Sequence, residues 1–72
     1  MEKLTKRELD VLRLMAYPWS EIQEKLNIKT PTLRTHVAHI HQKLCSENRA
    51  ETLIKALKKG LIKLDEIEVK ND

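Results

Sequence analysis

The first part of the chain carries apolar residues at helical spacing behind a helix-start signal. Thr5 and Glu8 have the separation of a capping box, in which each side chain satisfies a free backbone N–H group of the other residue. We therefore predict a helix that begins at Lys6. It should end before Pro18, because proline disfavours helical geometry in the residue that precedes it. The side chains expected to face inward are Leu9, Val11, Leu12, Met15 and Ala16.

The second predicted helix is short. Ser20 and Gln23 repeat the capping-box separation, which places this helix between Glu21 and about Leu26. Asn27 follows, and asparagine is one of the few residues that adopt the left-handed conformation found at helix ends.

The third pattern is the longest and most regular. Thr30 offers a cap oxygen, and Pro31 then occupies the first helical position, where proline costs nothing. A helix from about Pro31 to Leu44 is predicted. Its exposed face should carry no negative charge, because no acidic residue occurs between Lys29 and Ser46. The apolar residues, at separations of four, three and four, are Leu33, Val37, Ile40 and Leu44.

A fourth helix is expected to open at Asn48, which forms a third capping-box spacing with Glu51. Gly60 is expected at its C-terminal cap. Its apolar residues are Ala50, Leu53, Ile54 and Leu57. The segment 61–69 alternates only partly between apolar and charged residues, so a strand, a helix extension and a loose tail are all compatible with it.

These patterns predict an all-α fold, with one four-helix domain over residues 1–62 and an acidic tail over residues 63–72. The 72-residue chain contains no Phe and one Gly, and its apolar residues are mainly aliphatic, which suits packed helices rather than a sheet. Its single cysteine, Cys45, cannot form a disulfide within the chain and is expected to be a small packed residue. No apolar run approaches the roughly 18 residues of a membrane span, so a cytoplasmic protein is expected.

Positive charge is concentrated in the middle of the chain, although the formal net charge is only +3. Between Lys29 and Gly60 there are seven Lys or Arg residues and two Asp or Glu residues, whereas Leu61 to Asp72 contains two and four. A cationic middle segment suits a surface that faces phosphates.

The two predicted helices joined by the tight segment 27–30 have the layout of a helix-turn-helix. In this motif the second helix enters the major groove of double-stranded DNA. Arg34 can donate two hydrogen bonds to a guanine, and Thr35 can contact a thymine methyl group or a base-edge acceptor. The expected phosphate contacts are Lys29, Thr30, Thr32, His36, His39 and Lys43.

From Leu4 to Ile62 the chain resembles the LuxR/GerE-type helix-turn-helix regulators of bacteria, in order across all four predicted helices. The matching residues at the start are Leu4-Thr5-x-Arg7-Glu8-x-x-Val11-Leu12. In the centre they are Glu21-Ile22, Leu26, Ile28, Thr32-Leu33-Arg34-Thr35-His36, Ile40 and Lys43-Leu44. At the end they are Asn48-Arg49-Ala50-Glu51 and Gly60-Leu61-Ile62.

The resemblance implies a transcription regulator that binds an inverted-repeat DNA site as a homodimer. It implies base-reading roles for Arg34, Thr35 and Ala38 in the third helix, and a dimer contact in the fourth helix. The candidate interface residues are Thr52, Leu53, Lys55 and Ala56. Because Met1 lies three residues before the motif, we expect a free-standing regulator without an input domain, the alternative being an excised output domain.

The chain departs from the family pattern in three places. The segment before the second helix is two residues shorter and contains Pro18 and Trp19, and we expect Trp19 to plug the junction of the first two helices rather than to stack on a partner. Lys29 replaces the usual serine cap of the third helix. Ala38 stands where the family often has a longer, polar side chain.

The sequence argues against a metal site and against an enzyme. The histidines at positions 36, 39 and 41 scatter around a helix, and only His41 and Cys45 lie one turn apart, so neither a metal nor another cofactor is expected. No nucleophile with a base and an orienting group is evident, and neither is a small-molecule substrate, which argues against an enzyme. The alternative to DNA binding is a helix-turn-helix-shaped interaction module that acts on another regulator or on RNA polymerase.

Overall fold

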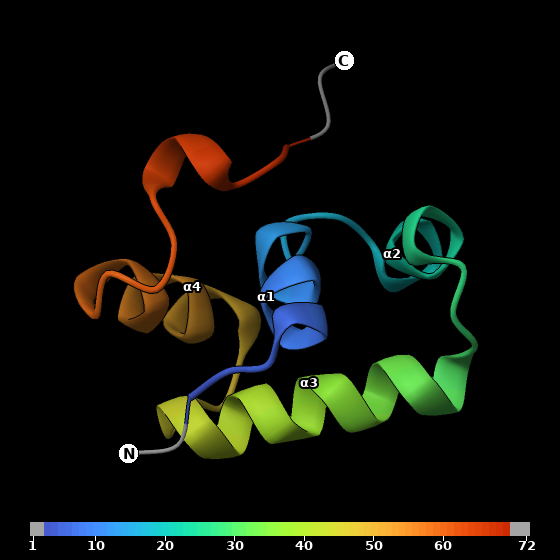
Figure 1. Cartoon of the computed structure of the whole chain (residues 1–72), viewed down its shortest axis with the longest axis horizontal. Helices are drawn as coiled ribbons and strands as arrows, with labels where there is room; N and C mark the ends of the chain where they lie inside the picture. Colours follow the sequence, from blue (N-terminus) through green and yellow to red (C-terminus); the bar gives the residue numbers. More distant parts are fainter. Residues whose placement is uncertain (1–2, 70–72) are drawn as a thin grey trace.

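The computed structural model describes residues 3–69 and contains four α-helices followed by a short 3-10 helix. The elements are α1 (Lys6–Arg13), α2 (Trp19–Leu26), α3 (Thr30–Leu44), α4 (Arg49–Lys58) and the 3-10 helix η1 (Leu64–Glu66). No strand occurs within residues 3–69, so the predicted all-α fold is confirmed (Figure 1).

Helix α1 begins as predicted, but it ends earlier. The backbone N–H of Glu8 donates to Oγ1 of Thr5, and the N–H of Thr5 donates to Oε1 of Glu8, which completes the capping box. After Arg13 the chain tightens into turns in which backbone N–H groups bond to carbonyls three residues back. These turns bring Tyr17 inward and leave Ala16 exposed, so the prediction that Ala16 is buried was wrong.

Helix α2 begins at Trp19, two residues before the predicted start. Pro18 is its N-cap, and no side chain caps this end, so the predicted capping box of Ser20 and Gln23 does not form. Instead, Nε2 of Gln23 donates to Oγ1 of Thr30, 2.9 Å away at the start of the next helix. The end of α2 is as predicted, because Asn27 has the left-handed conformation with φ 54°.

Helix α3 begins at Thr30, and the backbone of Lys29 is its N-cap. The prediction that the Thr30 hydroxyl caps this helix is wrong, because Thr30 is already its first residue and the Thr30 hydroxyl accepts a hydrogen bond from Gln23 instead. Leu33, Ile40 and Leu44 of the predicted stripe are buried, and Val37 is half-buried. Cys45 ends the helix in the left-handed conformation and is exposed, contrary to the expectation of a packed thiol.

Helix α4 has the predicted ends. Oδ1 of Asn48 accepts from the N–H of Glu51, but the Glu51 carboxylate accepts from the N–H of Glu47 and therefore does not close the predicted box. Gly60 has φ +72° just beyond the C-cap Lys59, as expected for a glycine that stops a helix. The inward face differs from the prediction: Ala50 and Ile54 are exposed, whereas Thr52 and Ala56 are buried.

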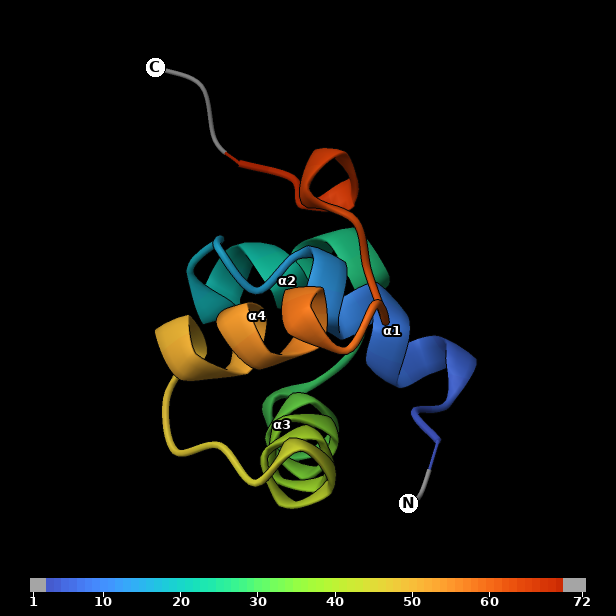
Figure 2. The same ribbon diagram turned by 90° about the vertical axis from the view of Figure 1, so that its left-hand side faces the viewer.

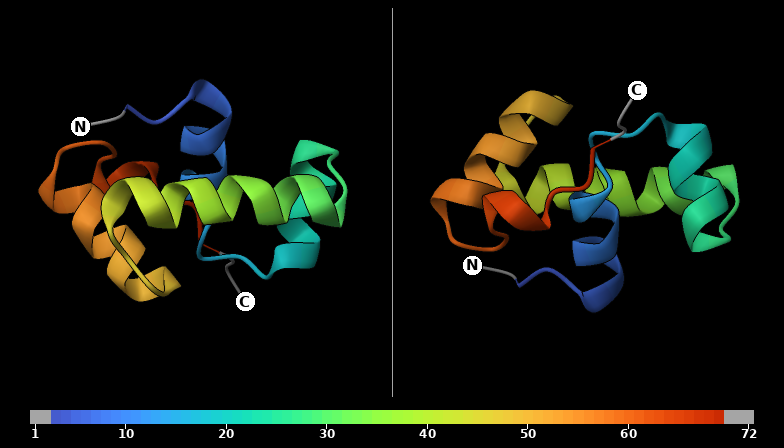
Figure 3. Two further views of the ribbon diagram at one scale, coloured as in Figure 1. Left: turned by 90° about the horizontal axis from the view of Figure 1, so that it is seen from below. Right: turned by 90° about the horizontal axis from the view of Figure 1, so that it is seen from above.

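The helices are arranged in two layers. Helix α3 runs along one side of the molecule, and α1, α2 and α4 all lie on the same side of it (Figures 1 and 2). The core between the layers is formed by the side chains of Val11, Leu12, Leu14, Met15, Tyr17, Ile22, Leu33, Ile40, Leu44, Ala56 and Ile62. This packing leaves the opposite side of α3 uncovered along its whole length (Figure 3).

The C-terminal segment folds back onto the end of α1. The N–H of Glu68 donates to the carbonyl of Arg13 over 3.0 Å, and the guanidinium of Arg13 lies 3.6 Å from the carboxylate of Glu66. The described residues therefore match none of the three arrangements left open by the sequence: the segment packs on α1 and is not a strand, an extension of α4 or a loose tail. Residues 70–72 of the predicted tail lie outside the described part. No helix within residues 3–69 is long and apolar enough to cross a membrane.

Candidate nucleic-acid interface

Helices α2 and α3 form the predicted helix-turn-helix, and the uncovered side of α3 is its candidate DNA-facing surface. The two helices are joined by the left-handed Asn27 followed by Ile28 and Lys29. The uncovered side has no negative charge, because α3 contains no acidic residue. Such a helix can enter the major groove without repelling the phosphates on either side.

The three predicted base-reading residues are brought together. Arg34, Thr35 and Ala38 are exposed and line one shallow depression with Thr30 and Pro31. Oγ1 of Thr35 donates to the carbonyl of Pro31 over 2.9 Å, so this hydroxyl offers a base only its lone pairs and the neighbouring methyl group. Arg34 forms no hydrogen bond or ion pair within residues 3–69, and its guanidinium is available to a partner.

The predicted phosphate contacts fall into two groups, one around the first turns of α3 and one beside the Glu8 carboxylate. Lys29, Thr30 and Thr32 are exposed around the start of α3, and His36 is half-buried one turn later. His39 is about half exposed, but its Nδ1 lies 3.5 Å from Oε2 of Glu8.

Lys43 lies where a phosphate contact is not expected. Its Nζ donates to Oε1 of Glu8 over 2.8 Å and to the carbonyl of Lys3 over 3.1 Å. Only 15% of the Lys43 side chain is exposed, and only 3% of the Glu8 side chain. The ammonium group is thus committed to a buried carboxylate, and the prediction that Lys43 contacts phosphate is not supported.

The Glu8 carboxylate is kept charged by its partners. Burial alone would raise its pKa, but the hydrogen bonds from Lys43 and from the Thr5 backbone, together with the charges of Lys43 and His39, outweigh burial and lower the pKa below its ordinary 4.5. Sequence reasoning found the Thr5–Glu8 capping box and missed its link to Lys43. The sequence signal for this link is that Lys43 directly precedes Leu44, the last residue of the apolar stripe, and so lies at the edge of the core.

Trp19 and Arg49 form a second contact that the sequence did not reveal. The guanidinium carbon of Arg49 lies 3.7 Å from the centre of the Trp19 ring, and Nη1 of Arg49 donates to the carbonyl of Tyr17 over 3.2 Å. Trp19 is half-buried against the core. It therefore ties α2 to α4 instead of simply plugging the junction of α1 and α2.

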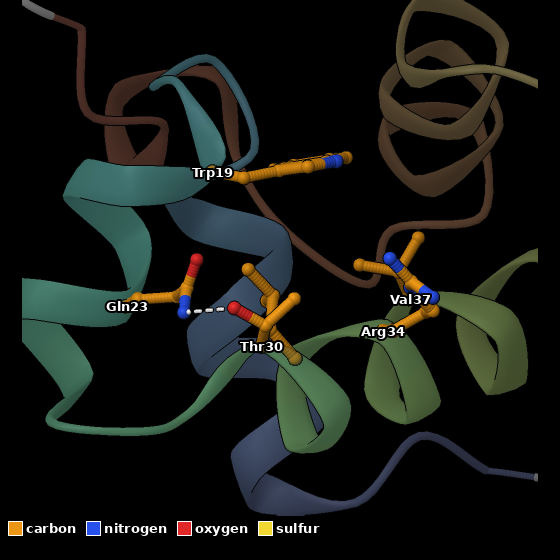
Figure 4. A pocket seen from close by; sticks show the side chains of 6 residues that line it. Trp19, Gln23, Thr30, Arg34 and Val37 are labelled. Atoms are coloured by element: carbon orange, nitrogen blue, oxygen red, sulfur yellow. Dashed lines mark hydrogen bonds between the residues drawn. The ribbon is translucent and has the colours of Figure 1, made fainter.

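The indole also borders a pocket of about 150 Å³ between α2 and α3. Figure 4 shows Trp19 and Gln23 on the α2 side, with Thr30, Arg34 and Val37 on the α3 side. The sixth lining residue is Leu33. Arg34 belongs to both this pocket and the base-reading depression.

The predicted dimer residues on α4 are only partly available. Thr52 and Ala56 are both 0% exposed, and Oγ1 of Thr52 lies 2.7 Å from Oγ of Ser46 inside the protomer. These two predictions are therefore wrong, because neither side chain reaches the surface. Leu53 and Lys55 are half-buried, and Nζ of Lys55 donates to the carbonyl of Cys45. The described residues contain no group of three or more His, Cys, Asp or Glu side chains able to hold a metal ion.

Comparison with known proteins identifies the family. Residues 2–56 match the family model described as bacterial regulatory proteins of the luxR family. The chain is 40% identical over 63 residues to the uncharacterized transcriptional regulatory protein YxjL of Bacillus subtilis, and 44% identical over 61 residues to the oxygen regulatory protein NreC of Staphylococcus carnosus. It is also 36% identical over 63 residues to the transcriptional regulatory protein DegU of Brevibacillus brevis.

These alignments cover 82–85% of the chain but only 27–29% of each relative. The chain thus spans less than a third of the length of these relatives. No solved structure matches it. The matched region includes α1, α2, α3 and most of α4, and contains both the helix-turn-helix and the base-reading depression. The chain belongs to the LuxR family of bacterial regulatory proteins and is a DNA-binding transcription-regulator domain, not an enzyme.

Proposed function

We propose that this domain binds specific DNA sequences through the uncovered side of α3, with Arg34, Thr35 and Ala38 facing the bases. The supporting observation is the shared depression that these three residues line, where a guanidinium without a partner among residues 3–69 lies beside a methyl-bearing threonine. Arg34 would select a guanine, while Thr35 and Ala38 offer apolar contact to a thymine methyl group. Because Ala38 has no polar group, selectivity rests mainly on Arg34.

The proposed phosphate contacts surround this depression. Lys29, Thr30 and Thr32 lie at the start of α3, and His36 and His39 lie farther along the helix. Lys43 is left out of this set because its ammonium is paired with Glu8. The DNA-facing surface therefore carries fewer cations than the sequence suggests.

The proposed unit is a homodimer on an inverted repeat, formed by the exposed apolar side of α4. Ile54 is 54% exposed, and the exposed Ala50 lies one turn before it on the same side of the helix. Leu57, one turn after Ile54, is half-buried against the core and contributes its outer part. These residues replace Thr52 and Ala56 as interface candidates. A dimer that spans two half-sites about 34 Å apart would combine two modest affinities into a useful one. With DNA as its partner, the protein is proposed to act in the bacterial cytoplasm.

The test is a selection of genomic fragments with purified protein, followed by a gel shift on the enriched sequence at two salt concentrations. We expect an enriched inverted repeat, bound with affinity that falls steeply as salt rises, and a dimer by sedimentation. Enrichment of a single half-site by a monomer would contradict the dimer and leave base reading intact.

A second candidate function is docking on another regulator or on RNA polymerase. The observation that favours it is the exposure of large apolar side chains away from α3, with Leu64 75% and Val69 57% exposed. Retention on heparin and calf-thymus DNA at low salt separates the two functions. Binding to neither support would favour the protein partner.

A further inference from the structure

We propose that the pocket between α2 and α3 is a binding site for a small planar aromatic carboxylate, and that its occupation withdraws Arg34 from DNA. The site itself is independent of the proposed function; only its effect on DNA rests on that function.

The size suits a single aromatic ring. The pocket volume is about 150 Å³, and an apolar protein cavity of similar size, roughly 150 Å³, is known to hold one benzene molecule. Two fused rings bearing further substituents would exceed it. The occupant is therefore a fragment-sized molecule rather than a nucleotide or a peptide.

The walls favour an aromatic ring with one acidic group. Trp19, Leu33 and Val37 supply an indole and two aliphatic side chains, against which a flat ring can stack and pack. The polar groups are the amide of Gln23, the hydroxyl of Thr30 and the guanidinium of Arg34, and no acidic residue lines the pocket. A guanidinium pairs with a carboxylate through two parallel hydrogen bonds.

Arg34 connects the pocket to the DNA-facing surface. Its side chain lines the pocket as well as the base-reading depression, and it has no partner within residues 3–69 that would hold it in either place. A carboxylate bound beside Trp19 would hold the guanidinium on the pocket side. The same group then cannot donate to a guanine, so ligand and specific DNA should compete.

Trp19 makes the site directly measurable, because it is the only tryptophan in the chain. Benzoate should change the Trp19 fluorescence until binding saturates, and it should shift the indole N–H resonance in proton–nitrogen correlation NMR spectra. Benzamide, which has the same ring and no charge, should bind at least about tenfold more weakly. Arg34→Gln should abolish this difference, whereas Thr35→Ala, an adjacent change outside the pocket, should preserve it.

Val37→Phe provides a second variant that fills the pocket and keeps Arg34. It should lose benzoate binding while its helical circular dichroism is unchanged. If it does not fold, Gln23→Leu replaces it and should weaken benzoate binding, because it removes a polar group from the pocket wall. Equal affinity for benzoate and benzamide, or resonance shifts confined to residues away from the pocket, would overturn the site.

The effect on DNA is read separately, by titrating benzoate into the complex with the selected sequence. We expect specific affinity to fall by at least about tenfold at saturating benzoate, with little change on random DNA. Saturable benzoate binding without such a fall would overturn the competition and leave the site standing. A protein that binds benzoate but no DNA at all would instead contradict the proposed function.

Discussion

Nζ of Lys43 lies 2.8 Å from Oε1 of Glu8, the same oxygen that accepts the backbone N–H of Thr5. One carboxylate oxygen thus serves the N-terminal cap of α1 and holds the last turn of α3 against it. This pair orients the reading helix from within, while the outer side of α3 stays free for DNA. It also determines which cation of α3 is unavailable to phosphate.

Replacing Glu8 by Gln should destabilise the domain by about 3 kcal/mol, because it leaves the largely buried Lys43 ammonium without its counter-charge and replaces the charged acceptor of the Thr5 N–H group by a neutral one. The effect is large for a 72-residue chain, whose whole stability is expected to be roughly 0.1 kcal/mol per residue. Urea unfolding followed by circular dichroism measures it. Glu24→Gln on the exposed side of α2 is the matched control, and equal losses in the two variants would contradict a special role of Glu8.

The same pair predicts a loss of stability in acid. Because the pKa of folded Glu8 is lowered below 4.5, its stabilisation is fully present above the unfolded pKa and is lost as the pH falls through the folded pKa. As the pH falls below about 4.5, the urea concentration at the unfolding midpoint should therefore decrease more steeply for the wild type than for Glu8→Gln. Parallel curves for the two proteins would show that other carboxylates dominate the acid transition.

Arg34 and Lys29 should affect DNA binding in different ways. Arg34→Ala should cost about 1–3 kcal/mol on the selected sequence and relax preference at one base position, with little effect on random DNA. Lys29→Ala should weaken binding to all sequences and reduce the slope of log affinity against log salt by about 1. Gel shifts on both DNAs at several salt concentrations distinguish these outcomes, and identical behaviour of the two variants would refute the assigned roles.

Ile54→Asp should dissociate the proposed dimer without unfolding the protomer. Ile54 is exposed in the protomer, so the new carboxylate stays in water there and becomes buried only when a dimer forms. Sedimentation should show monomers, and affinity should fall on the full inverted repeat but not on an isolated half-site. Leu64→Asp, at an even more exposed leucine outside α4, is the control. A dimer that survives Ile54→Asp would locate the interface elsewhere.

Local signals in the sequence predicted the fold well, and long-range contacts limited the prediction of the site. The Thr5–Glu8 cap, the left-handed Asn27 and the Gly60 stop depend on neighbours within a few residues, and all three appear. The spacing of Ser20 and Gln23 was equally regular but misleading, because Pro18 starts α2 earlier and Gln23 bonds to Thr30.

The residues of the site were harder to assign for the same reason. Exposure of Arg34, Thr35 and Ala38 follows from helical periodicity alone, since they lie opposite the apolar stripe. The inward turn of Lys43 and the stacking of Arg49 on Trp19 depend on partners more than twenty residues away. The burial of Thr52 and Ala56 depends on how α4 rotates against the core, which the short apolar pattern of that helix left ambiguous.

The early end of α1 leaves the carbonyl of Arg13 without a helical partner, and the N–H of Glu68 supplies one from the far end of the chain. The Glu66 carboxylate beside the Arg13 guanidinium fastens the same segment a second time. A protease that trims residues from the C-terminus should therefore stall close to Glu68. The amide of Glu68 should exchange its hydrogen with solvent as slowly as amides in the helices, although it lies outside all of them.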